Sequence, residues 1–176
     1  MSDRTWSPDL DRLAERHFGR KKVQPSIGEL RAFYRKAQEH LAYATIWWDG
    51  AARRELVRAF GEAIGRERLT CYACAVLRNH AHLLVRKHRL KAEQMLELLK
   101  DAGRSHLRGT GMAPPDHPVF SADSCHVFKS TPESVHSCVQ YIDDNYRKHN
   151  LPPIACAFVV PYDNWPFHKK NKSTAL

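Results

Sequence analysis

Two histidines stand one residue apart in the segment 76–86, whose sequence is VLRNHAHLLVR. Residues i and i+2 of a β-strand point to the same face, so we expect the imidazoles of His80 and His82 to lie side by side. Two adjacent imidazoles supply half of the ligands of a divalent-metal site. Histidine pairs on strands are more often ordinary surface or core residues, so the pair alone does not establish such a site.

The segments around the pair follow strand-like and helix-like patterns in a regular order. Short apolar runs predict four strands, at 41–48, 69–77, 80–86 and within 119–128. Helical spacing of apolar residues predicts three helices, at 51–66, 91–107 and about 130–149. With Arg78-Asn79 as a tight turn, the order βαββαβ plus a C-terminal helix predicts an α+β, ferredoxin-like fold with helices on one face of an antiparallel sheet.

The C-terminal helix carries a second set of polar residues beside its apolar stripe. Its core stripe is expected to consist of Val135, Val139, Ile142 and Tyr146. Tyr141 and Asn145 lie one turn apart and are displaced from that stripe, so both can reach across a groove beside the packing seam. Tyr141 could equally be a half-buried tyrosine with its hydroxyl in solvent, whereas the stripe position of Tyr146 favours a core role.

Composition narrows the class of protein and its partners. The chain has 176 residues, a formal net charge of +9 and five cysteines. The positive charge favours a polyanionic partner, although a basic chain can simply be soluble. The odd cysteine count in a chain of this size argues against a disulfide framework. Without a signal-like or membrane-spanning apolar run, we expect a cytoplasmic protein.

Basic side chains cluster on and after the histidine-bearing strand and along the helix that follows it. They could hold a nucleic-acid backbone, with an affinity that falls steeply with salt, or they could be an ordinary solvated face. The residues expected to bind DNA are Arg78, Arg86, Lys87, Arg89, Lys91, Arg104 and Arg108.

Cys71 and Cys74 have the spacing of a zinc ligand pair just before His80. On a strand the two thiols would point to opposite faces, and no second pair follows. We therefore expect them to pack as small apolar groups, with a structural zinc site as the minor alternative.

Two motifs together resemble a known family. Leu77–Val85 closely resembles the His-hydrophobic-His strand of single-tyrosine HUH transposases, and Tyr141-Ile142-Asp143-Asp144-Asn145 is similar to their tyrosine helix. The closest resemblance is to REP-associated tyrosine transposases, relatives of the insertion sequence 200/605 group. It covers residues 40–167, leaving an N-terminal basic helical extension at 1–39 and a basic tail at 168–176.

The resemblance implies a metal-dependent enzyme that cuts and rejoins single-stranded DNA, often beside a hairpin. Tyr141 would be the nucleophile, while His80, His82 and Asn145 would hold Mg²⁺ or Mn²⁺. The products would be a 5'-phosphotyrosine and a free 3'-OH, and attack by another 3'-OH would rejoin strands without ATP. Some relatives are homodimers in which the tyrosine helix serves the partner's histidine pair, and others are monomers.

Two departures from the family pattern leave these ligands unchanged. Many relatives have proline after the asparagine, where this chain has Tyr146, and a larger residue than Ala81 between the histidines. A domesticated relative that binds hairpin DNA or RNA without cutting it is the alternative function.

Overall fold

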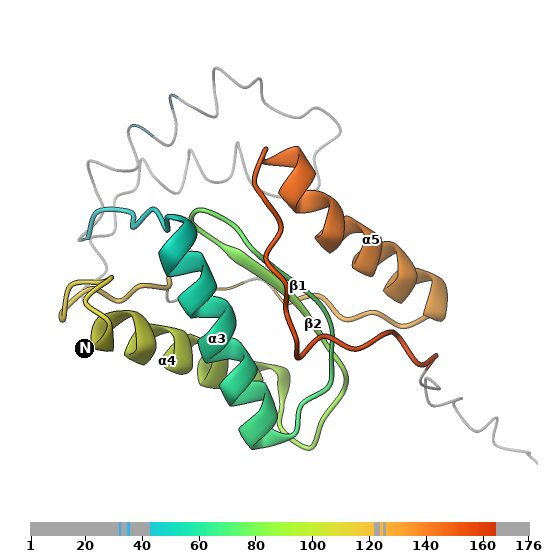
Figure 1. Cartoon of the computed structure of the whole chain (residues 1–176). Coiled ribbons are helices and arrows are strands. Elements are labelled where there is room, and N and C mark those ends of the chain that lie inside the picture. The colour runs from blue at the N-terminus through green and yellow to red at the C-terminus, as the bar shows by residue number, and fades with distance from the viewer. Residues whose placement is uncertain (1–31, 33–34, 36–42, 122–123, 125, 165–176) are drawn as a thin grey trace, which may run out of the picture. The chain divides into compact units, whose positions relative to one another are not determined.

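A computed structural model describes residues 32, 35, 43–121, 124 and 126–164. The chain divides into two compact units, Met1–Ile46 and Trp47–Leu176. The second unit contains α3 (Gly50–Glu67), β1 (Cys71–Val76), β2 (Ala81–Val85), α4 (Ala92–Gly109) and α5 (Pro132–Lys148) (Figure 1). These elements form an α+β fold with three helices and one antiparallel sheet of two strands. None of the described helices is long and apolar enough to cross a membrane.

The helices and the hairpin begin and end within two residues of the predicted positions. The other two predicted strands are not formed among the described residues, since neither 43–48 nor the described part of 119–128 is assigned as a strand. An apolar segment forms a β-strand only when it pairs with a neighbouring strand. Here the two segments make packing contacts instead, and the centre of the buried Trp48 ring lies 5.6 Å from that of the Phe120 ring. The predicted extension 1–39 and tail 168–176 lie outside the described residues, apart from Ala32 and Arg35.

The free edge of β1 is covered by side chains and by the segment after α5. Arg53 Nε donates a hydrogen bond to the Val76 carbonyl at 2.9 Å, and the Val76 N–H donates to the Tyr146 hydroxyl at 3.2 Å. At the other end of the strand, the Val160 N–H donates to the Cys71 carbonyl at 2.9 Å. These contacts satisfy backbone groups that an edge strand would otherwise leave open.

Helix α5 packs on one face of the hairpin. The buried residues in this interface are Ala73, Ala75, Leu77, Ile142 and Tyr146. The predicted helix stripe is confirmed, because Val135, Ile142 and Tyr146 are buried and Val139 packs against the same cluster. Ala75 is paired with His82 across the hairpin, and directly paired residues share a face, so His82 projects toward α5.

Helices α3 and α4 pack against each other (Figure 1). Asp49 caps the start of α3 through Oδ1, which accepts from the Ala52 N–H at 2.8 Å. Gly103 of α4 allows the close approach, because a Cβ there would lie 2.9 Å from Leu56 Cδ2 and 3.0 Å from the Phe120 ring. The two helices and the hairpin therefore support α5, the helix that carries Tyr141 and Asn145.

Candidate active site

The histidine pair lies at the turn end of β2. The Leu77 N–H donates to the His80 carbonyl at 2.8 Å, which closes the turn through Arg78 and Asn79 as predicted. The His80 and His82 ring centres are 5.0 Å apart, with the ring planes at 88°. Both imidazoles are half-buried. The two rings therefore occupy neighbouring positions on the face of the hairpin that meets α5.

Tyr141 of α5 lies beside this pair. Its ring centre is 5.6 Å from that of His82, with the planes at 79°, and 49% of the tyrosine surface is exposed. The predicted nucleophile and a predicted metal ligand thus approach each other within a single chain. Tyr146 is 8% exposed and its hydroxyl is engaged by the Val76 N–H, so its predicted core role is confirmed.

Two further side chains at the end of α5 reach the site, and the sequence analysis did not single them out. Lys148 Nζ lies 4.5 Å from the centre of the Tyr141 ring. The His149 ring centre lies 5.6 Å from that of His80. Both residues follow Tyr141 by two helical turns, a spacing that places them on its side of the helix and that could have identified them.

The backbone conformation at the end of α5 determines the position of His149. Asn150 has a positive φ of 50°, and its N–H donates to the Arg147 carbonyl at 3.1 Å. The next N–H, from Leu151, donates to the Tyr146 carbonyl at 2.9 Å. This pair of bonds is the Schellman arrangement, with Leu151 packed on the hydrophobic cluster that includes Tyr146. His149 is therefore the C-cap residue that directly follows α5.

The surroundings of the two strand histidines favour neutral imidazoles. Burial lowers the pKa of His80, and the neighbouring His82 and His149 lower it further. Burial, followed by the charge of His149, likewise lowers the pKa of His82. His80 Nδ1 is 2.8 Å from Asn79 Oδ1, an acceptor that fits an Nδ1–H tautomer. That tautomer leaves Nε2 with the lone pair that metal coordination needs.

Asn145 is 3% exposed and makes a hydrogen bond within its own helix. Its Nδ2 donates to the Tyr141 carbonyl at 2.7 Å. Because a carbonyl can only accept, the amide nitrogen must face it, and Oδ1 is the atom left to act as a ligand. The described contacts thus bring Asn145 to the backbone of Tyr141 rather than to either imidazole.

The predicted DNA-binding residues fall into two groups. Arg78, Lys87, Arg89 and Lys91 are exposed. The other three hold structure together: Arg86 pairs with Asp163 at 3.3 Å, Arg104 Nε donates to the Pro118 carbonyl at 3.0 Å, and Arg108 Nη2 donates to the His117 carbonyl at 2.6 Å.

The donor set at the site fits a divalent metal only in part. His80 and His82 supply two nitrogen donors, which suit a first-row transition metal. No three His, Cys, Asp or Glu side chains among the described residues are already spaced to hold a metal ion. The Cys74 thiol forms a hydrogen bond with the Cys156 thiol. This hydrogen bond raises the pKa of the Cys74 thiol and lowers the pKa of the Cys156 thiol.

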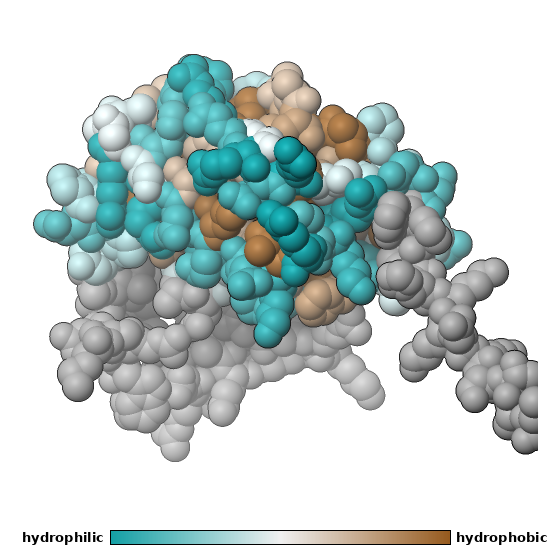
Figure 2. All heavy atoms as spheres, turned by 90° about the horizontal axis from the view of Figure 1, so that it is seen from below, coloured by the Kyte–Doolittle hydropathy of each residue, from teal (hydrophilic) through white to brown (hydrophobic). Residues whose placement is uncertain are grey.

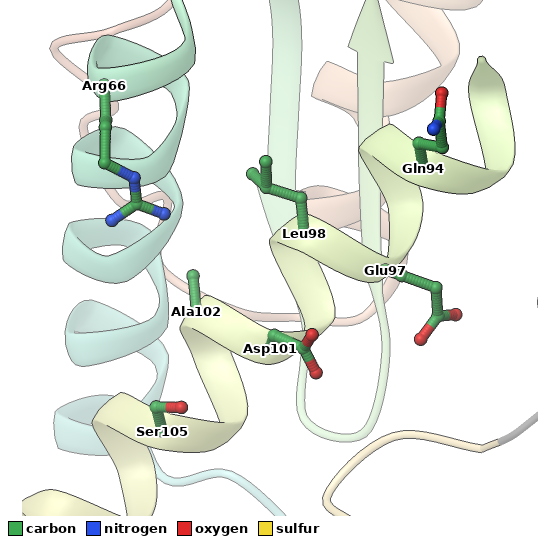
Figure 3. A pocket seen from close by; sticks show the side chains of 7 residues that line it. All are labelled: Arg66, Gln94, Glu97, Leu98, Asp101, Ala102 and Ser105. Carbon is green, nitrogen blue, oxygen red and sulfur yellow. The ribbon is translucent and has the colours of Figure 1, made fainter. Parts of the chain in front are cut away.

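A separate hollow of about 590 Å³ lies between α3 and α4. Figure 3 shows the side chains that line it: Arg66, Gln94, Glu97, Leu98, Asp101, Ala102 and Ser105. The carboxylates of Glu97 and Asp101 form ion pairs with Lys100 and Arg104 of the same helix. The negative charge of these two carboxylates makes the hollow a poor binding site for a polyanion. On the face drawn in Figure 2, the described side chains are mainly hydrophilic, with hydrophobic ones in small groups.

Comparisons with protein-family models, with curated proteins and with solved structures found no match to this chain.

Proposed function

We propose that this chain is a single-tyrosine HUH transposase of the REP-associated type, a metal-dependent endonuclease and strand transferase for single-stranded DNA at hairpin-flanked sites. The observation that carries the proposal is the position of Tyr141 beside the histidine pair. The centres of the Tyr141 and His82 rings are 5.6 Å apart, and those of the His82 and His80 rings are 5.0 Å apart. An exposed tyrosine, a neutral histidine pair and a net charge of +9 suit attack on a phosphodiester of a polyanion.

His80 and His82, with Asn145 Oδ1 as the third ligand that the resemblance implies, would hold Mg²⁺ or Mn²⁺. Lowered pKa values support this role, because imidazoles bind metals in their neutral form. The bound cation would supply positive charge that polarises the scissile phosphate and offsets the charge of the transition state.

In the proposed reaction, the Tyr141 oxygen attacks phosphorus and the bond from phosphorus to the 3'-oxygen breaks. The proton lost by the phenol is balanced by the proton gained by the leaving 3'-oxygen, so the products are a 5'-phosphotyrosine and a 3'-OH. Attack by a 3'-OH reverses the step and releases the tyrosine. The Lys148 ammonium lies 4.5 Å from the centre of the Tyr141 ring, where its positive charge would attract the phosphate that approaches the phenol.

The exposed basic residues would hold the DNA backbone on both sides of β2, with Arg78 beside the histidines and the others beyond the opposite end of the strand. Arg78 adjoins the histidine pair in the turn, and Lys87, Arg89 and Lys91 follow β2. Trp47 is 60% exposed and offers a ring on which an unpaired base can stack. The ion pair and hydrogen bonds of Arg86, Arg104 and Arg108 favour structural roles for those three.

We also propose the ferredoxin-like plan for the fold and a cytoplasmic, nucleoid-associated location for the protein. The observed order of α3, hairpin and α4 agrees with the inner part of βαββαβ. The site residues gather in one chain, so a homodimer is not required for the tyrosine to reach the histidines.

A covalent-adduct assay tests the function. Labelled single-stranded hairpin DNA is incubated with the protein and Mn²⁺ or Mg²⁺, and the products are separated on a denaturing gel. We expect a protein-linked DNA band that is lost in Tyr141→Phe, because the phenol oxygen forms the bond, and in His80→Ala, because the metal site is broken. Tyr146→Phe removes a hydroxyl from the same helix and should keep the band.

Two outcomes would contradict the proposal. A band that persists in Tyr141→Phe and disappears in Tyr146→Phe would mean that Tyr146, and not Tyr141, is the nucleophile. Tight binding of hairpin DNA or RNA, without an adduct under any metal, would favour the non-cutting binding protein.

A further inference from the structure

We infer that Cys74 and Cys156 are a redox pair, which a low-molecular-weight disulfide such as oxidised glutathione converts into a reversible disulfide bond. Cys74 lies in β1, and Cys156 lies in the segment that follows α5. The bond ties this segment to the edge of β1 that it covers. The inference does not rest on the proposed function, because it involves neither the histidine pair nor Tyr141.

The segment after α5 lies beside the edge of β1 and contacts it on both sides of Cys74 (Figure 1). On one side, the guanidinium of Arg53 donates hydrogen bonds to the carbonyls of Val76 and Pro152, at 2.9 Å and 3.0 Å. Further along the segment, Cys156 Sγ lies 4.0 Å from the Cys74 carbonyl oxygen. The path of the backbone therefore brings Cys156 level with Cys74.

Hydrogen bonding and packing also hold the segment in place beyond Cys156. The Val160 N–H donates to the Cys71 carbonyl at 2.9 Å. The Phe158 ring lies against α3, where a Cβ on Gly61 would come within 2.8 Å of Phe158 Cδ1. Because the segment is held on both sides of Cys156, a disulfide can form there in the native fold.

The thiols of the pair are already in contact. The Cys74 thiol forms a hydrogen bond with the Cys156 thiol. A disulfide needs two sulfur atoms about 2.05 Å apart, with Cβ atoms separated by about 3.5–4.5 Å. Thiols in hydrogen-bond contact approach this geometry through rotation of their side chains. Cys71, the other cysteine of β1, is 0% exposed, and its thiol donates to the Ala73 carbonyl at 3.2 Å instead.

Cys156 is the thiol that meets the oxidant. It is partly exposed, whereas Cys74 is buried. The hydrogen bond from Cys74 lowers the pKa of the Cys156 thiol, which raises the fraction of nucleophilic thiolate at neutral pH. The Cys156 thiolate attacks one sulfur of oxidised glutathione, the glutathione disulfide bond breaks, and one glutathione leaves as a thiolate that takes up a proton.

Cys74 completes the exchange. The pKa of its thiol is raised first by the hydrogen bond to Cys156 and then by burial, and the first cause is lost once Cys156 carries glutathione. The Cys74 thiol loses its proton and its sulfur attacks the Cys156 sulfur, which releases the second glutathione. Two protein thiols are thereby oxidised to one disulfide, one glutathione disulfide is reduced to two thiols, and both protons pass to the glutathione sulfurs.

Peptide mapping of the oxidised full chain tests the inference without an activity readout. The reduced chain is incubated with oxidised glutathione, its remaining thiols are alkylated, and a non-reducing digest is analysed by mass spectrometry. Fragmentation of linked peptides from the unmodified chain identifies the two cysteines that are joined. The same treatment of Cys74→Ser provides the direct comparison. Cys71→Ser is the matched control, because Cys71 is a buried cysteine of the same strand, and thermal melting checks that both variants are folded.

We expect a peptide pair that links Cys74 to Cys156 and is lost after treatment with dithiothreitol. The pair should persist in Cys71→Ser, whereas Cys74→Ser should leave Cys156 as a mixed disulfide with glutathione. Recovery of Cys156 from the unmodified chain only as a free thiol or a mixed disulfide would overturn the inference. A bond from Cys156 to any cysteine other than Cys74 would overturn it as well.

Discussion

Lys148 Nζ lies 4.5 Å from the centre of the Tyr141 ring, so an ammonium group sits against the face of the proposed nucleophile. The two residues are on the same side of α5, two turns apart. An ammonium over an aromatic ring is attracted by the negative face of the ring, and it also attracts a phosphate brought to the ring edge. Lys148 is therefore placed to position both partners of the attack.

Replacing Lys148 with alanine should slow adduct formation by about 2–5-fold, the factor that corresponds to the about 0.5–1 kcal/mol of an exposed cation–π contact. Lys148→Arg should restore most of the rate, because the positive charge over the ring is kept. The measurement is the rate of the protein–DNA band under single-turnover conditions.

Arg147→Ala is the matched control for Lys148, because Arg147 is the adjacent cation of α5 and pairs with Asp144 at 3.2 Å. Its removal should leave the rate of adduct formation nearly unchanged. Equal effects of the two alanine variants would mean that general positive charge, rather than the contact with Tyr141, sets the rate.

Removal of the buried guanidinium of Arg53 should strongly destabilise the fold. Arg53 is 2% exposed and donates to the Val76 carbonyl at 2.9 Å and to the Pro152 carbonyl at 3.0 Å. Arg53→Met keeps most of the side-chain volume but leaves both carbonyls without this donor. We expect a loss of about 2–4 kcal/mol in the free energy of unfolding, measured by urea denaturation.

The neighbouring exposed residue offers a control for Arg53, since Arg54→Met removes the same group from the surface of α3. Its effect on the free energy of unfolding should stay within about 0.5 kcal/mol. A similarly small effect of Arg53→Met would show that the two hydrogen bonds do not stabilise the edge of β1.

Acid should weaken the junction of α3 and α4. Glu55 Oε2 lies 2.5 Å from His106 Nε2, and this hydrogen bond lowers the pKa of the Glu55 carboxyl below its ordinary value of 4.5. A lowered carboxyl pKa in the folded state gives stability that is present above the unfolded value and lost as pH falls through the folded value. The difference in melting temperature between the unmodified chain and Glu55→Gln should therefore shrink below about pH 4.5.

Glu62→Gln changes an exposed carboxyl of the same helix and is the control for this pH series. Its melting temperature should differ from that of the unmodified chain by an amount that depends less on pH. A difference for Glu55→Gln that is constant from neutral pH to about pH 3 would contradict a stabilising ionised Glu55.

Local sequence signals predicted the helices and the hairpin correctly, whereas the two further strands that they predicted are not formed among the described residues. The apolar stripe through Ile142 recurs within a few residues, so it can be read from the chain directly. Strand formation at 43–48 depends on a partner elsewhere in the chain. The edge of β1 that could have been that partner is occupied by Arg53 and Tyr146, neither of which belongs to a strand.

Some features of the candidate site can likewise be predicted from the sequence, and others cannot. Strand alternation places His80 beside His82, and helix geometry places Tyr141 off the core stripe. The contact between His149 and His80 joins two distant segments, so the two-turn spacing from Tyr141 indicates the side of the helix on which His149 lies but not its partner. Charge alone also does not reveal that loop carbonyls accept hydrogen bonds from Arg104 and Arg108, whose predicted contact with DNA stays a prediction.

The left-handed turn at Asn150 has a consequence for the order in which the candidate site is assembled during synthesis. The turn sends the chain back to Pro152, whose carbonyl meets Arg53 of α3. When a ribosome-bound chain has emerged only as far as β2, it already contains His80 and His82. It does not yet contain α5, which carries Tyr141, or the segment from Asn150 to Pro152 that follows this helix. Tyr141 therefore comes to lie beside His82 only after α5 and the segment through Pro152 have left the ribosome.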